Sequence, residues 1–283
     1  MGGIVYRTGG PYPALLRQEI TARNVAYAAR KGANHVTSYG EMPIVVYPRS
    51  ECGRYHGNFV PAAYRAIVKR PDWERRLQKA HSQGKSSLPR GDSRWRELDS
   101  SMSSDALLMN IFCYPGVLRR PEVCRVLGIE RGEQPEFGYR PRIPLLNRQG
   151  DRTEIDMRLG SLLCEAKLTE TDFQIQSAKL VEHYRDFQAV FDCQRLPRKA
   201  EQYLSYQLIR NVLAAYALDL RFCVLLDARR PDLLQDWYDI LSCVGPASLR
   251  TRCMVLTWQE LSGCLPTPLR RFLDDKYGIV PAS

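Results

Sequence analysis

The sequence has no apolar run long enough to cross a bilayer, and the longest runs, such as residues 224–226, span only a few residues. Its start, Met-Gly-Gly-Ile-Val-Tyr-Arg, also lacks the apolar core of a signal peptide. We therefore expect a cytoplasmic protein with no membrane partner.

Paired cysteines and clustered histidines are lacking as well. None of the nine cysteines forms a Cys-x-x-Cys pair, and Cys164, Cys223 and Cys253 lie in apolar runs, which favours reduced, buried thiols over disulfides or zinc ligands. The four histidines show no His-x-x-x-His spacing, which argues against a zinc hydrolase. Cys52 and His56 suggest a nucleophile with its base, but a tight turn is the simpler interpretation.

Positive charge is in surplus. The 41 Lys and Arg residues against 31 Asp and Glu residues give a net charge of +10, which favours polyanionic partners. Basic clusters lie within residues 69–96, 119–120, 195–199 and 229–230, and Tyr64, Trp73 and Trp95 are interleaved with the first of them. Such clusters indicate either a nucleic-acid surface or ordinary solvated helix faces.

The chain is long enough for one large domain or two smaller ones. Residues 1–100 are rich in Gly, Tyr, Arg and Pro, and we expect an N-terminal α+β extension with helices near 13–31 and 61–80 and a strand at 43–47. A basic loop at 82–93 marks a soft boundary to a second domain, residues 101–283.

The second part alternates between helical and strand-like segments. Ser103, Ser104 and Asp105 offer an N-cap to a helix at 106–112, and Pro141 and Pro144 confine a strand at 137–146 to a sheet edge. Further helices are expected at 121–128, 172–190, 199–218 and 231–243, and strands at 153–159, 162–168, 221–227 and 252–257. This order predicts an α/β fold with a mixed central sheet flanked by helices.

The two strands at 153–159 and 162–168 carry the chemistry. Because side chains alternate along a strand, one face is apolar or small and the other is mostly charged, with Leu163 as the exception. The apolar face comprises Ile155, Met157, Leu159, Leu162, Cys164, Ala166 and Leu168, and the charged face comprises Glu154, Asp156, Arg158, Glu165 and Lys167.

Gly160 and Ser161 suit a two-residue type II′ turn, which sets Asp156 opposite Glu165 and Glu154 opposite Lys167. Two opposed carboxylates destabilise a strand pair unless a divalent cation binds both. An adjacent lysine then orients a water or stabilises phosphate charge. The alternative is a plain amphipathic hairpin with a solvated charged face and Glu154–Lys167 as a surface ion pair.

Asp156 followed by Glu165-Ala166-Lys167 resembles the signature of the PD-(D/E)XK nuclease superfamily, although Ile155 stands where that signature has proline. The resemblance implies that Asp156, Glu165 and the carbonyl of Ala166 ligate Mg²⁺, with Mn²⁺ as a substitute. It also implies that Lys167 positions or activates the attacking water.

The resemblance covers residues 101–230 and implies the restriction-endonuclease-like αβββαβ core; the second half also resembles a bacterial branch with no assigned substrate. It suggests an acid on the first core helix, for which Asp105 is the nearest match, although Asp105 equally suits a helix N-terminus. Gln202 and Tyr206 fit a Gln-x-x-x-Tyr spacing on the helix after the motif. Gln207 and Arg210 are alternatives there, and Glu154 is a further supporting residue.

Together these features predict a Mg²⁺-dependent nuclease that hydrolyses phosphodiester bonds in DNA. The rival hypothesis is a catalytically inactive nucleic-acid-binding or scaffold protein on the same fold. Cutting two strands takes two sites, which leaves a homodimer open.

Overall fold

A five-stranded mixed sheet lies at the centre of the computed structural model, which describes residues 11–38, 43–50, 53–80 and 95–282. The loop expected at 82–93 therefore lies outside the described residues. The strand order is β12 (Cys253–Thr257), β11 (Arg221–Leu226), β7 (Leu162–Ala166), β6 (Ile155–Leu159) and β3 (Pro135–Tyr139). β7, β11 and β12 run parallel, whereas β3, β6 and β7 pair antiparallel. The predicted α/β fold with a mixed central sheet is confirmed.

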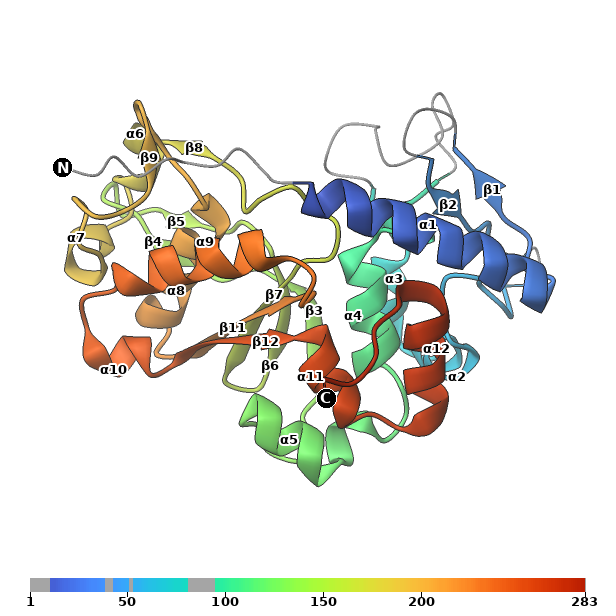
Figure 1. Ribbon diagram of the computed structural model, residues 1–283. Helices are drawn as coiled ribbons and strands as arrows, with labels where there is room; N and C mark the ends of the chain where they lie inside the picture. Colours follow the sequence, from blue (N-terminus) through green and yellow to red (C-terminus); the bar gives the residue numbers. More distant parts are fainter. Residues whose placement is uncertain (1–10, 39–42, 51–52, 81–94, 283) are drawn as a thin grey trace.

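Helices cover both faces of this sheet (Figure 1). One face packs against the α4 core, a hydrophobic cluster built around α4 (Ser104–Phe112), and the other against the α8 core, built around α8 (Tyr206–Ala217) and α9 (Pro231–Ser242). The succession α4, β3, β6, β7, α8, β11 matches the predicted αβββαβ order.

The hairpin of β6 and β7 forms with the predicted register. Leu159 pairs with Leu162, Arg158 with Leu163 and Met157 with Cys164. The turn depends on Gly160, whose φ of 57° lies in the left-handed region that favours glycine.

The β6–β7 ladder ends at Met157 and Cys164. A continued ladder would pair Ala166 with Ile155, but the Ala166 N–H instead donates to Asp156 Oδ2 at 2.8 Å. On its other side β7 stays paired, because Ala166 pairs with Leu225 and the Lys167 N–H donates to the Leu225 carbonyl at 2.8 Å. The two strands therefore separate at the carboxylates.

The alternative of a plain amphipathic hairpin with a solvated charged face is wrong. Leu163 and Ile155 belong to the α8 core, while Met157 and Cys164 belong to the α4 core. Leu163 breaks the sequence pattern because α8 and α9 cover the charged face of the hairpin. Arg158 stays half-buried on that face, with its guanidinium 5.0 Å from the ring centre of Tyr139.

The N-terminal part forms α1 (Tyr12–Lys31) as expected. The helix predicted at 61–80 is two helices, α2 (Pro61–Ile67) and α3 (Pro71–Arg76), because Pro71 forces Arg70 into an extended conformation. The short strands β1 (Val36–Thr37) and β2 (Val45–Val46) pair with each other. The α4 core runs from Leu16 to Ile279 and so includes residues from both predicted domains; the boundary at residue 100 stays a prediction.

Three further predicted segments are divided in the structure. The strand at 137–146 is β3 followed by β4 (Ile143–Pro144), which pairs with β5 (Gly150–Asp151). The helix at 172–190 contains β8 (Gln176–Ser177), α6 (Ala178–Val181) and α7 (Phe187–Val190). The helix at 199–218 begins only at Tyr206, because the preceding residues form β9 (Arg198–Lys199) and β10 (Gln202–Tyr203) in a small sheet with β8. The remaining elements are η2 (Glu97–Asp99), η3 (Val117–Arg119), α5 (Pro121–Leu127), α10 (Ala247–Arg250), α11 (Trp258–Gly263) and α12 (Thr267–Tyr277).

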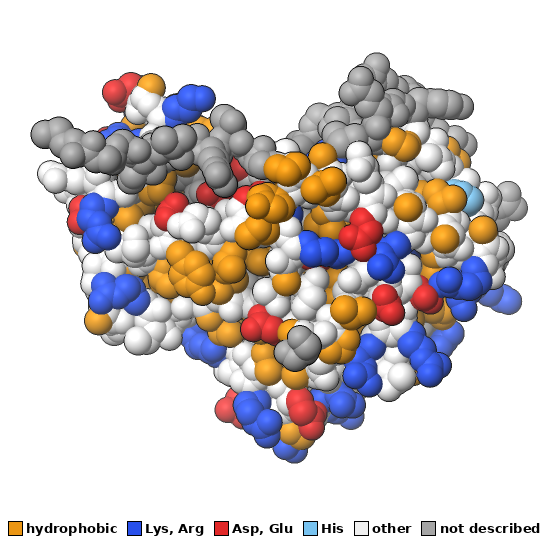
Figure 2. All heavy atoms as spheres, viewed as in Figure 1, with side chains coloured by type: hydrophobic (Ala, Val, Ile, Leu, Met, Phe, Trp, Pro, Cys, Tyr) orange, Lys and Arg blue, Asp and Glu red, His pale blue; other side chains and the backbone are white. Residues whose placement is uncertain are grey.

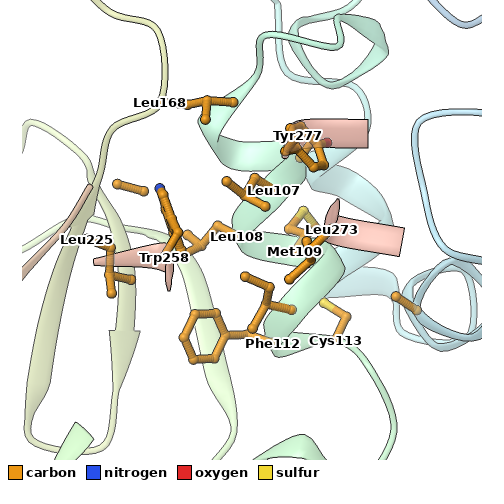
Figure 3. Close-up of a cluster of buried hydrophobic side chains, with 14 of the residues drawn as sticks. Leu107, Leu108, Met109, Phe112, Cys113, Leu168, Leu225, Trp258, Leu273 and Tyr277 are labelled. Carbon is orange, nitrogen blue, oxygen red and sulfur yellow. The ribbon is translucent and has the colours of Figure 1, made fainter. Parts of the chain in front are cut away.

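The α4 core explains why most residues of α4 are apolar. Every residue of α4 is buried, and the helix is capped by Ser103, whose side chain accepts from the Ala106 N–H. Figure 3 shows Trp258 between α4 and the strand that carries Leu225, with Leu273 on the opposite side of the helix.

Eight of the nine cysteines lie in the described residues, and all eight are free, as predicted. Across the described ranges, no helix combines the length and the hydropathy that a membrane span requires.

Truncation of Leu108 to alanine should lower the free energy of unfolding by about 2–5 kcal/mol, because Leu108 is fully buried between α4 and the sheet. Denaturant unfolding measures this loss. Leu15 on α1 is 57% exposed, so Leu15→Ala is the control and should change stability by less than about 0.5 kcal/mol. Equal effects of the two variants would contradict the assignment of the core.

Candidate active site

Asp156, Glu165 and Lys167 meet where β6 and β7 separate. Lys167 Nζ donates to Glu165 Oε1 at 3.0 Å, and both side chains are buried. Asp156 is only half-buried and accepts the Ala166 N–H. The site therefore combines a buried ion pair with a second, half-buried carboxylate.

Helix α8 holds this ion pair from the side. Lys167 Nζ also donates to Gln207 Oε1 at 2.8 Å, and Asn211 Nδ2 donates to Glu165 Oε2 at 2.8 Å. Residues four apart lie on the same face of a helix, so one face of α8 contacts both members of the pair. Each oxygen of Glu165 thus has its own donor.

A buried hydrogen-bond chain continues from Asn211 away from the sheet. Arg210 Nη1 donates to Asn211 Oδ1 at 2.9 Å, and Arg210 Nε donates to Asp151 Oδ2 at 2.7 Å. Asp151 also accepts the hydroxyl of Tyr184 at 2.7 Å, which in turn lies 2.9 Å from the Tyr206 hydroxyl. Because Arg210 binds the Asn211 oxygen, the amide of Asn211 is left with its nitrogen toward Glu165.

The charge state of Lys167 follows from its neighbours. Burial alone would lower the pKa of Lys167, but the carboxylates of Glu165, Glu170 and Asp156 together raise it above the usual value. Lys167 is therefore a protonated donor, which suits it to orient a nucleophile or stabilise an anion rather than to act as a base.

Asp156 experiences the opposite balance. Burial and the negative charges of Glu165 and Asp105 raise the pKa of Asp156 well above its usual value, and Lys167 and Lys79 offset them only in part. The site thus carries more negative charge than its own lysines neutralise.

Asp105 lies at the edge of the site, on α4, in contact with two cations from the N-terminal part. Arg76 Nη2 lies 2.9 Å and Lys79 Nζ 2.6 Å from Asp105 Oδ2. Burial would raise the pKa of Asp105, but Arg76 and Lys79 outweigh it and hold the pKa at about 2. Glu97 lies beside the same lysine, and burial and Asp105 raise the pKa of Glu97 to about 7.

Glu154 does not pair with Lys167, so the surface ion pair of the alternative amphipathic hairpin does not form. Its Oε1 accepts Arg76 Nη1 at 2.5 Å and lies 3.6 Å from Lys79 Nζ. The ladder ends before these residues, so the expected opposition of Glu154 and Lys167 does not form. Gly138 on β3 makes room for this contact: a Cβ there would lie 2.4 Å from Arg76 Nη1.

Residues 12–278 match the model of the family described as "Restriction Endonuclease associating with ARP". The chain belongs to this restriction-endonuclease family. No curated protein and no solved structure matches it.

The family match covers α1 to α12 and therefore includes α8. On α8, the sequence placed one residue wrongly and missed another. Gln202 is not on this helix: it lies exposed on β10, so the Gln202–Tyr206 pair does not share a helical face. Gln207 is the glutamine that reaches the site, and Asn211 was missed. The spacing of Gln207 and Asn211 on an apolar helix was the signal that would have found Asn211.

The donors available to a metal ion are Asp156, Glu165 and a backbone carbonyl. The N–H and C=O of one strand residue point to the same edge, so the Ala166 carbonyl faces β6, as its N–H does. Within the described part of the chain, no three acidic, histidine or cysteine side chains form a ready-made metal cluster. Asp105 is bound to Arg76 and Lys79 and does not contribute a free carboxylate.

Several members of the predicted basic and aromatic clusters are buried, and residues 81–94 of the first cluster lie outside the described ranges. Tyr64, Trp73 and Trp95 are buried and are not available for stacking on bases. Arg230 is fully buried and holds the loop after β7 through the Glu170 carbonyl, and Arg76 is buried in the site. On the face seen in Figure 2, Lys and Arg side chains are scattered mainly along the lower and right edges.

Replacing Asp105 with asparagine should lower the free energy of unfolding at neutral pH by about 3 kcal/mol, because it removes the buried anion that Arg76 and Lys79 share. The folded-state pKa lies below the value near 3.9 of an unfolded chain, so this stabilisation is present above that value and is lost as the pH falls. Urea unfolding should therefore show the difference shrinking as the pH is lowered from about 5 towards 3.

Asp72→Asn is the matched control, since Asp72 pairs with Arg70 on the surface and should cost less than about 1 kcal/mol. A difference between wild type and Asp105→Asn that does not change with pH would refute the assigned charge state.

Proposed function

We propose that this protein is a Mg²⁺-dependent nuclease that hydrolyses phosphodiester bonds in DNA, with an active site of the PD-(D/E)XK type. Asp156, Glu165 and Lys167 are its catalytic residues. The observation that carries the proposal is the meeting of these three side chains at the point where β6 and β7 separate, in a member of a restriction-endonuclease family.

The residues present fit a hard divalent cation. Asp156, Glu165 and the Ala166 carbonyl are oxygen donors, which Mg²⁺ and Mn²⁺ prefer. The raised pKa of Asp156, caused by burial and by Glu165, marks an excess of negative charge that a cation would relieve. When bound, Mg²⁺ supplies Lewis acidity to a phosphoryl oxygen and favours deprotonation of a water.

Lys167 supplies a protonated ammonium beside the two carboxylates. Because neighbouring acids keep it charged, it orients the attacking water through a hydrogen bond and stabilises the negative charge that builds on the phosphate oxygens. Gln207 limits the positions of its Nζ.

Asn211 holds the carboxylate of Glu165 in one orientation. Its amide binds Oε2 while Lys167 binds Oε1, so the carboxylate cannot rotate without breaking a hydrogen bond. Groups positioned in this way before the substrate arrives lose little further entropy in the reaction.

Two cations, Arg76 at the end of α3 and Lys79 shortly after it, support the charge balance of the site. Arg76 and Lys79 bind Asp105 and Glu154, so they limit the excess negative charge next to Asp156. Tyr206 and Arg210 support α8 through Asp151. A homodimer stays a prediction, based on the need for two sites to cut two strands.

Purified protein should cut DNA in the presence of Mg²⁺ or Mn²⁺ and lose this activity with EDTA. Asp156→Asn, Glu165→Gln and Lys167→Met should each lower kcat by at least about 100-fold, since each removes a group that contacts the reacting phosphate or its metal. Cleavage is followed on labelled single-stranded and duplex substrates of DNA and RNA.

Glu136→Gln is the matched control, because Glu136 is an exposed carboxylate on β3 of the same sheet and should leave kcat unchanged. Circular dichroism and thermal melting establish that each variant is folded. Full activity of folded Asp156→Asn or Glu165→Gln protein would refute the proposed site.

The second candidate function is a catalytically inactive nucleic-acid-binding or scaffold protein. The buried contacts of Glu165 favour it, because both of its oxygens already have protein donors. Calorimetric titration with Mn²⁺ separates the two: the nuclease gives binding heat that Asp156→Ala abolishes, whereas the scaffold gives negligible heat with both.

A further inference from the structure

A short arginine-bearing hairpin leads directly into the strand that carries Asp156. β4 and β5 pair through Ile143 with Asp151 and Pro144 with Gly150, and β6 begins four residues later. Arg140, Arg142, Arg148 and Arg152 lie on or beside this hairpin, and all four are exposed. Its one acid, Asp151, is turned inward to Arg210 and Tyr184.

Three of these arginines have no acidic partner. Arg142, Arg148 and Arg152 form no ion pair with any residue in the described ranges, and the nearest acid to Arg140 is Glu154 at 3.9 Å. Elsewhere in the site, Arg76 and Lys79 are neutralised by acids. The hairpin thus presents uncompensated positive charge to the solvent.

Arg148 occupies a backbone position that ordinarily belongs to glycine. The loop is closed between Leu145 and Gln149, and Arg148 lies at its end with a φ of 65°. Three-residue hairpin loops place glycine at this left-handed position, where a side chain is strained. Strain of this kind concentrates at sites where a side chain has a function.

The hairpin is held firmly and is connected to the site. The Leu146 N–H donates to the His183 carbonyl at 3.0 Å, and the Arg185 N–H donates to the Pro144 carbonyl at 3.1 Å. At its base, Asp151 binds Arg210, which binds Asn211, the partner of Glu165. Figure 1 shows β4 and β5 on the α8 side of the molecule.

We infer that the β4–β5 hairpin is a DNA-binding arm that contacts the phosphates of a duplex with Arg148 and its neighbouring arginines while the proposed active site contacts the scissile phosphate. This inference rests on the proposed function, because it names where that substrate is held.

The dimensions of the hairpin suit a DNA duplex. Arg148 precedes Asp156 by eight residues, so their Cα atoms lie at most about 28 Å apart, within one turn of B-DNA, about 34 Å. A two-stranded ribbon fits the wide major groove of B-DNA, whereas the major groove of duplex RNA is too deep and narrow for side chains to read. The partner is therefore duplex DNA.

The test exploits the strain at Arg148. Arg148→Gly removes one charge and relieves the left-handed backbone, so its melting temperature should equal or exceed that of the wild type. Its affinity for a labelled DNA duplex of mixed sequence should fall about tenfold, measured by fluorescence anisotropy of the full chain in EDTA. The negative slope of log affinity against log salt should become shallower by about 0.9, the value for one lost phosphate contact.

Arg271→Gln is the control, since Arg271 is an exposed arginine on α12 and its loss removes the same charge. It should leave affinity and slope as in the wild type. The inference would be overturned if wild type and Arg148→Gly bound DNA with equal affinity, or if both variants lost affinity equally. It would also be overturned if the wild type did not bind duplex DNA, or if it bound duplex RNA more tightly.

Failure of the two proposals is distinguishable. DNA binding that depends on Arg148, with no cleavage in Mg²⁺, would support the arm and contradict the nuclease proposal. DNA cleavage by the wild type, with unaltered DNA binding by Arg148→Gly, would support the nuclease proposal and contradict the arm.

Discussion

The site depends on one hydrogen bond, from the Ala166 N–H to the Asp156 carboxylate. That N–H would otherwise belong to the β6–β7 ladder, and by accepting it Asp156 ends the pairing of the two strands. β7 stays fixed, because β11 continues to pair with it and Trp258 Nε1 donates to the Lys167 carbonyl at 2.9 Å. Beside the opening between the strands, Asp156 is half-buried, whereas Glu165 and Lys167 are buried.

Charge balance explains why distant segments converge on this opening. Four acids, Asp105, Glu154, Asp156 and Glu165, lie near one another, and most of their counter-charge comes from other elements. Arg76 and Lys79 come from the N-terminal part, and Lys167 directly follows β7; Gly138 leaves space for the Arg76 guanidinium. The remaining excess of negative charge is expressed in the raised pKa of Asp156, caused by burial and Glu165. A divalent cation would complete the balance, which is why the geometry and the family membership support the same proposal.

Local patterns predicted the central elements well. The alternation of residues 153–168, with glycine at the turn, was sufficient for the hairpin and for its register near the turn. Patterns failed where neighbouring elements override local preference. Gln202 was assigned to a helix because Gln202 and Tyr206 fit the Gln-x-x-x-Tyr spacing of the resembled family, but pairing with β8 and β9 holds Gln202 in a strand. Asn211 was missed because its spacing of four residues from Gln207 gains meaning only when their partners, Glu165 and Lys167, are known.

The sequence by itself determined the α/β class, the hairpin and the side of it on which Asp156, Glu165 and Lys167 lie, because strand alternation and turn chemistry act between near neighbours. Only the tertiary structure decided that both faces of the hairpin are covered, that the ladder ends at the carboxylates, and that Arg76, Lys79, Gln207 and Asn211 surround them. These contacts join residues far apart in the chain. They depend on burial and on the pairing of buried charges, which no local spacing encodes.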